Sequence, residues 1–244
     1  MVSDRMAALL DELAVRRTDG LDASFAGRCC AVLGVDGLAV TLSSSGYEGE
    51  LVWSGDPLSA QLDDLQFTLG EGPSTDAARG GVLILESDLL LVPAVRWPGF
   101  LDAVRSLEMR AVFAVPLQIG AIQVGVFTCR RSEAGPLGNS ALTDALVLAD
   151  ALTLVLLGDV AIGFAELAAL HRAEVHQATG MISVRLGVAP AIALVRLRAY
   201  AFAAERPILD VAKDVVARKL HFPADGTARG ENEDNGTQRP DGCG

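Results

Sequence analysis

The sequence predicts an α+β domain, in which helices flank an antiparallel sheet, followed by a long helix and an all-α domain of three helices. Strand-like and helical periods alternate along residues 1–140. Residues 141–171 are almost continuously apolar, and residues 171–222 carry three short apolar stripes at helical spacing. A chain of 244 residues, half of them hydrophobic, is long enough for two such domains.

The first domain begins with two expected helices, residues 3–17 and 21–33, whose apolar residues recur at helical spacing. A hairpin follows, with strands at residues 37–43 and 50–54 joined across a Ser/Gly turn. The remaining expected elements are helices at 57–67 and 99–107, a buried strand at 81–86, two long strands at 110–119 and 121–129 joined through Gly120, and a long helix capped by Asn139 or Ser140.

The turn Gly70–Thr75 is the densest local signal in this domain. Its two glycines indicate a tight turn, and Pro73 suits the first turn of a helix. Backbone N–H groups at such a helix start could face an anion, but Glu71 on the same loop would repel one. We therefore favour the interpretation that Ser74 and Thr75 cap the helix.

Four short motifs in the first domain carry a family resemblance. They are Leu65-Gln66-Phe67 running into Gly70-Glu71-Gly72-Pro73, then Arg96-Trp97-Pro98, Val112–Leu117 and Val124–Phe127. In this order they resemble a GAF domain. The resemblance implies a sensor domain, residues 1–157, that responds to a small-molecule ligand or a partner.

Residues 171–222 are expected to form three short helices separated by two breaks. Gly187 has the place of a C′ glycine after the first helix, and Pro190 and Pro207 suit the starts of the next two. No stripe is wide enough to stabilise a helix alone, so the three must pack together. The stripes are residues 171, 175, 178, 182 and 186, then Leu194, Leu197, Ala201 and Ala204, then Ile208, Val211, Ala212, Val215 and Leu220.

These helices carry a second set of motifs. They are Val175-His176-Gln177-Ala178-Thr179-Gly180-Met181, Leu186-Gly187-Val188, Ala193, Leu197-Arg198, Ala201 and Val211-Ala212. In order and spacing they resemble the ANTAR module, the three-helix RNA-binding output domain of bacterial antitermination regulators, and a GAF domain ahead of it is a familiar actinobacterial arrangement. Ala189 departs from the family pattern, which has Ser or Thr there, so this helix start is expected to be weaker by about 1 kcal/mol.

The charge is divided along the chain. The net charge is −11, but residues 1–170 carry −12 and residues 171–222 carry +4, from eight basic and four acidic side chains. Positive charge is thus concentrated in the three-helix domain, as contact with a phosphate backbone requires. An amphipathic bundle with a solvated arginine face would have the same charge. The division of charge alone therefore does not distinguish such a bundle from a nucleic-acid-binding module.

The candidate RNA-binding residues combine seven of the eight cations of this domain with three motif or aromatic positions. Tyr200 is either a stacking platform for a base or a half-buried core residue. Gly180 allows either close helix packing or the approach of RNA. The full set is Arg172, Gly180, Met181, Arg196, Arg198, Tyr200, Arg206, Lys213, Arg218 and Lys219.

Nothing in the sequence indicates catalysis, and no catalytic residue, cofactor or metal site is predicted. Residues 1–170 contain no histidine, which excludes His-ligated haem, a His-based metal site and a Ser–His or Cys–His pair there. Cys129 is expected to pack in the core. A redox enzyme that uses Cys129 is the alternative in this class.

No membrane span or secretory signal is predicted, and we expect a cytoplasmic protein. The apolar stretch 141–165 contains Asp144, Asp150 and Asp159, each of which would cost roughly 2.5–3.5 kcal/mol at a bilayer centre. The same stretch predicts either a homodimer seam or packing on its own sheet. Residues 223–244 have no apolar pattern and are expected to form a disordered tail.

Together these features predict a signal-responsive transcription antitermination regulator. Residues 158–222, the connecting helix and the ANTAR-like helices, would bind RNA hairpin loops, and a homodimer would bring two such modules together. The alternative is a DNA-binding or protein-interaction transcriptional regulator without RNA contact.

Overall fold

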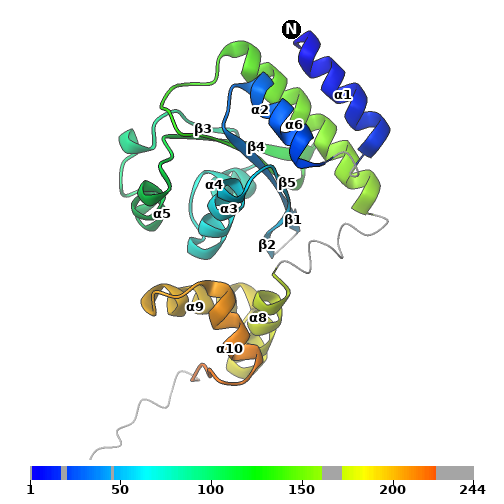
Figure 1. The fold of residues 1–244 in the computed structure, drawn as a ribbon. Helices are drawn as coiled ribbons and strands as arrows, with labels where there is room; N and C mark the ends of the chain where they lie inside the picture. Colours follow the sequence, from blue (N-terminus) through cyan, green and yellow to red (C-terminus); the bar gives the residue numbers. More distant parts are fainter. Residues whose placement is uncertain (1, 18–20, 45–46, 161–171, 224–244) are drawn as a thin grey trace, which may run out of the picture.

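A computed structural model describes residues 2–17, 21–44, 47–160 and 172–223. Its N-terminal part is a mixed α/β domain with a five-stranded antiparallel sheet of order β2-β1-β5-β4-β3 (Figure 1). The strands are β1 (Gly37–Ser44), β2 (Tyr47–Ser54), β3 (Ile84–Glu86), β4 (Ala111–Ile119) and β5 (Ile122–Arg131).

One face of the sheet is covered by α1 (Asp4–Arg16), α2 (Ala23–Leu33) and α6 (Asn139–Val160) (Figure 1). The first two helices start at side-chain caps, because Ser3 accepts a hydrogen bond from the Met6 N–H and Asp22 accepts one from the Phe25 N–H. The layer between these helices and the sheet is apolar, and its fully buried side chains include Phe25, Leu38, Phe113, Phe127 and Leu148.

The opposite face is covered by α3 (Pro57–Leu69), α4 (Pro73–Gly80) and α5 (Pro98–Val104), each of which has proline in its first turn. Two short 3₁₀ helices, η2 (Leu89–Leu91) and η3 (Arg105–Leu107), complete this side. A second apolar layer lies under these helices and includes Leu62, Trp97, Phe100 and Val112.

Helix α6 packs on the sheet through one face. Its Asp144 is buried and accepts hydrogen bonds from the Ser3 backbone N–H at 2.9 Å and from the Ser3 hydroxyl at 2.7 Å, which ties α6 to the start of α1. Over Asn139–Gly158 its mean hydropathy is 1.9, so it is apolar enough to cross a membrane by length and composition, but 44% of that stretch is buried inside the protein. Helices that pack in protein cores can have the same length and composition, so one such helix is weak evidence for a membrane span.

The C-terminal part consists of α8 (Ala173–Leu186), α9 (Pro190–Ala203) and α10 (Ile208–Val216), packed around their own apolar core. The expected end of the first helix and start of the second are confirmed. Gly187 ends α8 in the left-handed region with φ +64°, and Pro190 lies in the first turn of α9. Ala189 precedes α9 without a side-chain cap. The predicted stripes form the core, except that Ala204 is exposed at the end of α9 and Leu220 follows α10.

The predicted buried strand at 81–86 is wrong in extent and burial. Only Ile84–Glu86 is a strand, and it lies at the sheet edge, paired with β4. Val82, Leu83 and Leu85 are exposed. The apolar run has the composition of a core strand. As an edge strand, however, β3 has a neighbouring strand on one side only, so its side chains are more exposed than those of a central strand.

The predicted capping by Ser74 and Thr75 is also wrong. The residue before α4 is Gly72, which has no side chain to cap the helix. Instead Gln66 of α3 accepts a hydrogen bond from the Ser74 N–H at 2.7 Å, and the Ser74 hydroxyl is bonded to Gln66 and to Thr128 of β5. A side chain from another helix thus accepts a hydrogen bond from a backbone N–H group in the first turn of α4, which has no partner within the helix.

Two predictions fall outside the described residues. These are the disordered tail, apart from Pro223, and the part of the 141–171 run that begins at residue 161 and includes the first stripe position, 171.

Candidate nucleic-acid interface

Five of the ten residues predicted to bind RNA form two groups. Arg172 and Arg198 face the N-terminal domain, whereas Gly180, Met181 and Arg218 line a cavity at the other end of α8. The two groups have different chemistry.

Arg172 lies immediately before α8 and is 3% exposed. Its guanidinium donates hydrogen bonds to the carboxylates of Asp63 and Asp64, both at 2.8 Å, and to the Gly49 carbonyl at 2.5 Å. Asp63 also accepts a hydrogen bond from the Thr41 hydroxyl at 2.6 Å. Burial raises the pKa of Asp63, and Arg172 opposes that rise. A buried ion pair therefore joins α8 to α3.

Phe67, near the end of α3, lies between two arginines. The Arg172 guanidinium carbon is 3.8 Å from the Phe67 ring centroid, and that of Arg198 is 4.9 Å from it. Phe67 is 6% exposed and belongs to the apolar core of the C-terminal helices, although it comes from the N-terminal domain. Gly70 follows with φ +68°, and a Cβ there would lie 3.0 Å from an Arg198 nitrogen. The two domains therefore meet over Phe67.

His176 adds a further contact between the domains. Its Nε2 atom is bonded to the Glu50 carboxylate on β2. With Arg172 and Arg198, this contact makes one side of α8 and α9 part of the interface with α3 and β2. We call this set of contacts the domain interface.

The expectation that Arg172 and Arg198 supply exposed positive charge is therefore wrong for this structure. The physical reason is that both arginines have partners on α3. The aromatic face of Phe67 attracts guanidinium groups, and the buried Asp63 carboxylate requires a cation. The sequence signal for this contact was Asp63, one helical turn before Phe67 on the same face of α3.

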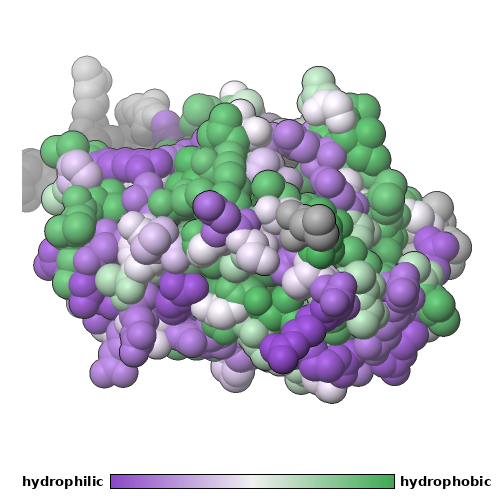
Figure 2. All heavy atoms as spheres, turned by 90° about the horizontal axis from the view of Figure 1, so that it is seen from above, coloured by the Kyte–Doolittle hydropathy of each residue, from purple (hydrophilic) through white to green (hydrophobic). Residues whose placement is uncertain are grey.

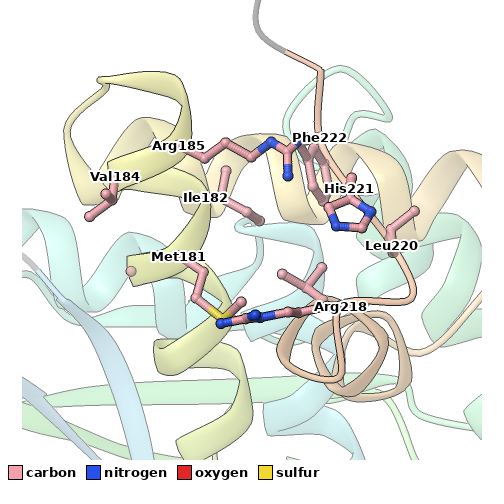
Figure 3. A pocket seen from close by; sticks show the side chains of 10 residues that line it. Met181, Ile182, Val184, Arg185, Arg218, Leu220, His221 and Phe222 are labelled. Carbon is pink, nitrogen blue, oxygen red and sulfur yellow. The ribbon is translucent and has the colours of Figure 1, made fainter.

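The second group lies along a groove of about 490 Å³ between α8 and the segment that follows α10 (Figure 3). We call it the α8 groove. Most of its walls are apolar, while Arg185, Arg218 and His221 are basic or titratable. It is lined by Gly180, Met181, Ile182, Val184, Arg185, Val215, Arg218, Leu220, His221 and Phe222.

Gly180, Met181 and Arg218 were predicted from the sequence and are brought together here. Gly180 is exposed, and a Cβ at this position would meet nothing within 4 Å. Close packing against another helix is therefore not the reason for this glycine. Arg185 was missed although it is a cation one helical turn after Met181, and His221 and Phe222 were missed because they follow the last helix.

Tyr200 adjoins the groove. Its ring is 38% exposed and packs edge to face on Phe222, a groove residue, with 5.5 Å between the ring centroids. It is therefore neither isolated on the surface nor part of the helical core. Its position extends the aromatic surface of the groove toward α9.

The other predicted cations are distributed over the rest of the bundle. Lys213 and Lys219 are exposed, and Arg196 on α9 is half-buried. Arg206 donates a hydrogen bond to Asp214 at 2.7 Å, and this contact raises the pKa of the Arg206 guanidinium. These side chains are available to solvent but do not line the groove.

The three cysteines within the described residues are not placed for thiol chemistry. Cys129 is buried, and burial raises the pKa of its thiol well above the ordinary value. Burial likewise raises the pKa of Cys29 to about 12 and that of Cys30 to about 11. Among the described residues, no three His, Cys, Asp or Glu side chains are grouped to hold a metal ion. The prediction that Cys129 packs in the core is confirmed.

Comparison with known proteins gives similarity to GAF domains in solved structures. No family model matches the chain, and no curated protein is similar to it. The GAF domain of an Acinetobacter phosphoenolpyruvate-protein phosphotransferase is 16% identical, with a TM-score of 0.48 over 66% of this chain and 95% of that chain. The corresponding domain from Coxiella burnetii is 15% identical, with a TM-score of 0.48 over 65% and 98%.

A phycoerythrobilin-bound GAF domain from a cyanobacterial phytochrome is 11% identical, with a TM-score of 0.45 over 64% of this chain and 96% of that chain. All three TM-scores lie below 0.5, so the similarity does not by itself establish membership of the GAF family.

Proposed function

We propose that the chain is a signal-responsive regulator of transcription antitermination, with a GAF-type sensor at residues 1–157 and an ANTAR-type RNA-binding module at residues 158–222. The order of the sequence motifs supports this assignment. Helix α8 ends at the motif glycine, Gly187, and α9 begins at Pro190. The role is one of binding and signalling rather than catalysis.

The observation that carries the proposal is the division of charge. Residues 171–222 carry +4 beside a neighbouring region of −12. Arg185, Lys213, Arg218 and Lys219 of the module are exposed, so their charges are available to phosphates. The acidic region would repel nucleic acid and thereby restrict binding to the module.

The domain interface provides a route by which the sensor acts on the module. Arg172 and Arg198 are cations of the module that are held against Phe67 of the sensor helix α3. A small molecule or a partner that displaces α3 would return both cations to solvent. RNA affinity would then depend on the state of the sensor.

A homodimer would present two modules to two hairpin loops, and linked binding multiplies weak affinities. The proposed seam is the outer side of α6, where Leu146, Leu154 and Leu157 are exposed. Figure 2 views the molecule from above, the side on which α1 and α6 lie in Figure 1, and shows apolar groups among polar ones. A cytoplasmic location fits a protein that binds nascent transcripts.

Selection from a library of two-hairpin RNAs with randomised loops would test the proposal. The intact chain should enrich a common loop sequence, and excess duplex DNA should not displace the selected RNA. Recovery of no RNA above background, or displacement by DNA at equal concentration, would favour the alternative of a DNA-binding or protein-interaction regulator.

A further inference from the structure

We propose that the α8 groove holds one unstacked purine base of an RNA loop, with the flanking phosphates on Arg185 and Arg218. The inference rests on the proposed RNA-binding function and assigns the place where a base is held. It is argued from the size, lining, charge and accessibility of the groove.

The size and lining suit a flat apolar group. A volume of about 490 Å³ lies within the range of small-molecule sites. Met181, Ile182, Val184 and Leu220 supply apolar walls, and Phe222 supplies an aromatic one. Thioether and aromatic groups both interact favourably with π-systems, and a two-ring base covers more of such a wall than a one-ring base.

The charges suit the phosphates on either side of such a base. Arg185 extends from α8 toward Phe222 and His221, whereas Arg218 extends toward Met181 (Figure 3). Both arginines are exposed, and among the residues that the structure describes none that lines the groove is acidic. Guanidinium groups bind phosphate in bidentate geometry, so the cations can hold the RNA backbone while the base enters between them.

The rim of the groove is open at Gly180, where a Cβ would meet nothing within 4 Å. Glycine inside a helix is destabilising relative to alanine, and no helix within the described part of the chain packs closely here to explain it. Glycine at this position leaves the rim open, so that an RNA backbone can approach the groove.

The groove also lies away from the domain interface. Its residues come from the second half of α8 and from segment 215–222, whereas Arg172 and His176 contact the sensor from the first half of α8. Base insertion is therefore compatible with the domain arrangement described above.

The test uses the intact chain and a selected hairpin RNA carrying 2-aminopurine at each loop position in turn. We expect a fluorescence change at one position when the protein binds. Removal of the base at that position should weaken binding about tenfold or more, because its stacking contact with the groove is lost.

A matched pair of variants assigns that signal to the groove. Gly180→Leu adds a side chain over the rim without changing the charge, and should weaken binding about tenfold and remove the fluorescence change. Ala191→Leu, at an exposed position of α9 outside the groove, should leave both unchanged. Melting temperatures verify that both variants fold.

The outcomes separate the two proposals. If the unaltered chain binds the RNA and Gly180→Leu binds equally well with the same fluorescence change, the base-binding groove is rejected while RNA binding stands. If the unaltered chain binds no hairpin RNA, both fail. If free purine nucleotide binds, Gly180→Leu blocks it and RNA binding is unchanged, the groove is a nucleotide site and the inference is overturned.

Discussion

Arg172 has a structural role that its residue type and position did not indicate. In the sequence it is one of eight cations of a basic module, but in the fold it pairs with the buried Asp63 and covers Phe67. A long-range contact decided its role, because the partner lies more than a hundred residues earlier in the chain. Its contribution is therefore to folding and domain contact in the described state.

Arg172→Met should lower the free energy of unfolding by about 3–5 kcal/mol, because it leaves the buried Asp63 carboxylate without its cation. Urea denaturation monitored by circular dichroism would measure the change. Arg105→Met is the control, since Arg105 is exposed and its ion pair with Asp102 is on the surface, so the expected change is below about 0.5 kcal/mol. Equal effects of the two substitutions would contradict the assigned role.

The loss in Arg172→Met should also depend on pH. Burial already raises the pKa of Asp63 above its unfolded value, and removal of Arg172 takes away the charge that opposes this rise. Above the unfolded pKa the unfolded state releases the proton while the folded variant retains it, so the stability of the variant falls as pH increases. Denaturation at pH 4 and pH 7 should show the larger deficit at pH 7, and a larger deficit at pH 4 would contradict this sign.

Gly180 and Gly187 should respond oppositely to alanine. Gly180 has open space at its Cβ position inside a helix, so Gly180→Ala should raise the free energy of unfolding by about 1 kcal/mol. Gly187 has φ +64°, so Gly187→Ala should lower it by about 1–2 kcal/mol. Thermal and urea denaturation of the pair would measure both, and destabilisation by Gly180→Ala would indicate a packing role for that glycine.

At the scale of elements, the sequence predicts well those helices whose signals are local. Proline in the first turn and glycine at the end define α3 to within a few residues of its predicted bounds, and Gly187 and Pro190 end α8 and begin α9 as expected. Prediction failed where a distant residue decides the outcome. Gln66 replaces the expected cap at α4, and the edge position of β3 exposes residues that read as core.

The candidate site could be predicted in part for the same reason. Gly180, Met181 and Arg218 meet in the α8 groove because α8 packs on α10 and Arg218 lies just after the end of α10. Arg172 and Arg198 could not be placed, because their partners lie on the N-terminal domain. Phe222 and His221 complete the groove from beyond the last helix, where no periodic pattern identifies them.

The outer side of α6 should form the homodimer seam. Leu154→Glu places a charge at a position that is 66% exposed, and this should shift the protein toward monomer without loss of folding. Sedimentation velocity over a range of concentrations would measure the shift. Leu91→Glu, at another exposed apolar position, is the control. A monomeric unaltered protein, or a dimer that Leu154→Glu leaves intact, would contradict this seam.

At the scale of the whole molecule, the domain interface is the contact through which the proposed sensor would act on the proposed RNA-binding module. Phe67 belongs to α3 of the N-terminal domain but packs in the core of the C-terminal helices, between Arg172 and Arg198. A change in the position of α3 therefore changes the surroundings of two cations.

Phe67→Ala should weaken the domain interface and raise the affinity for the selected RNA several-fold, because Arg198 regains solvent. Fluorescence anisotropy would measure affinity, and urea denaturation would show a loss of about 3–5 kcal/mol. Trp97→Phe alters another buried aromatic residue of the sensor, outside the domain interface, and should leave RNA affinity unchanged. Unchanged or lower affinity in folded Phe67→Ala would contradict a restraining role for this contact.

The salt dependence of RNA binding by the intact chain tests the central claim most directly. Anisotropy titrations with the selected hairpin RNA should give log affinity that falls linearly with log salt, with a slope of about −2 to −3.5 for three to five phosphate contacts. Duplex DNA of equal length should bind more weakly at every salt concentration. A flat salt dependence, or equal affinity for duplex DNA, would contradict an RNA-binding module built on these cations.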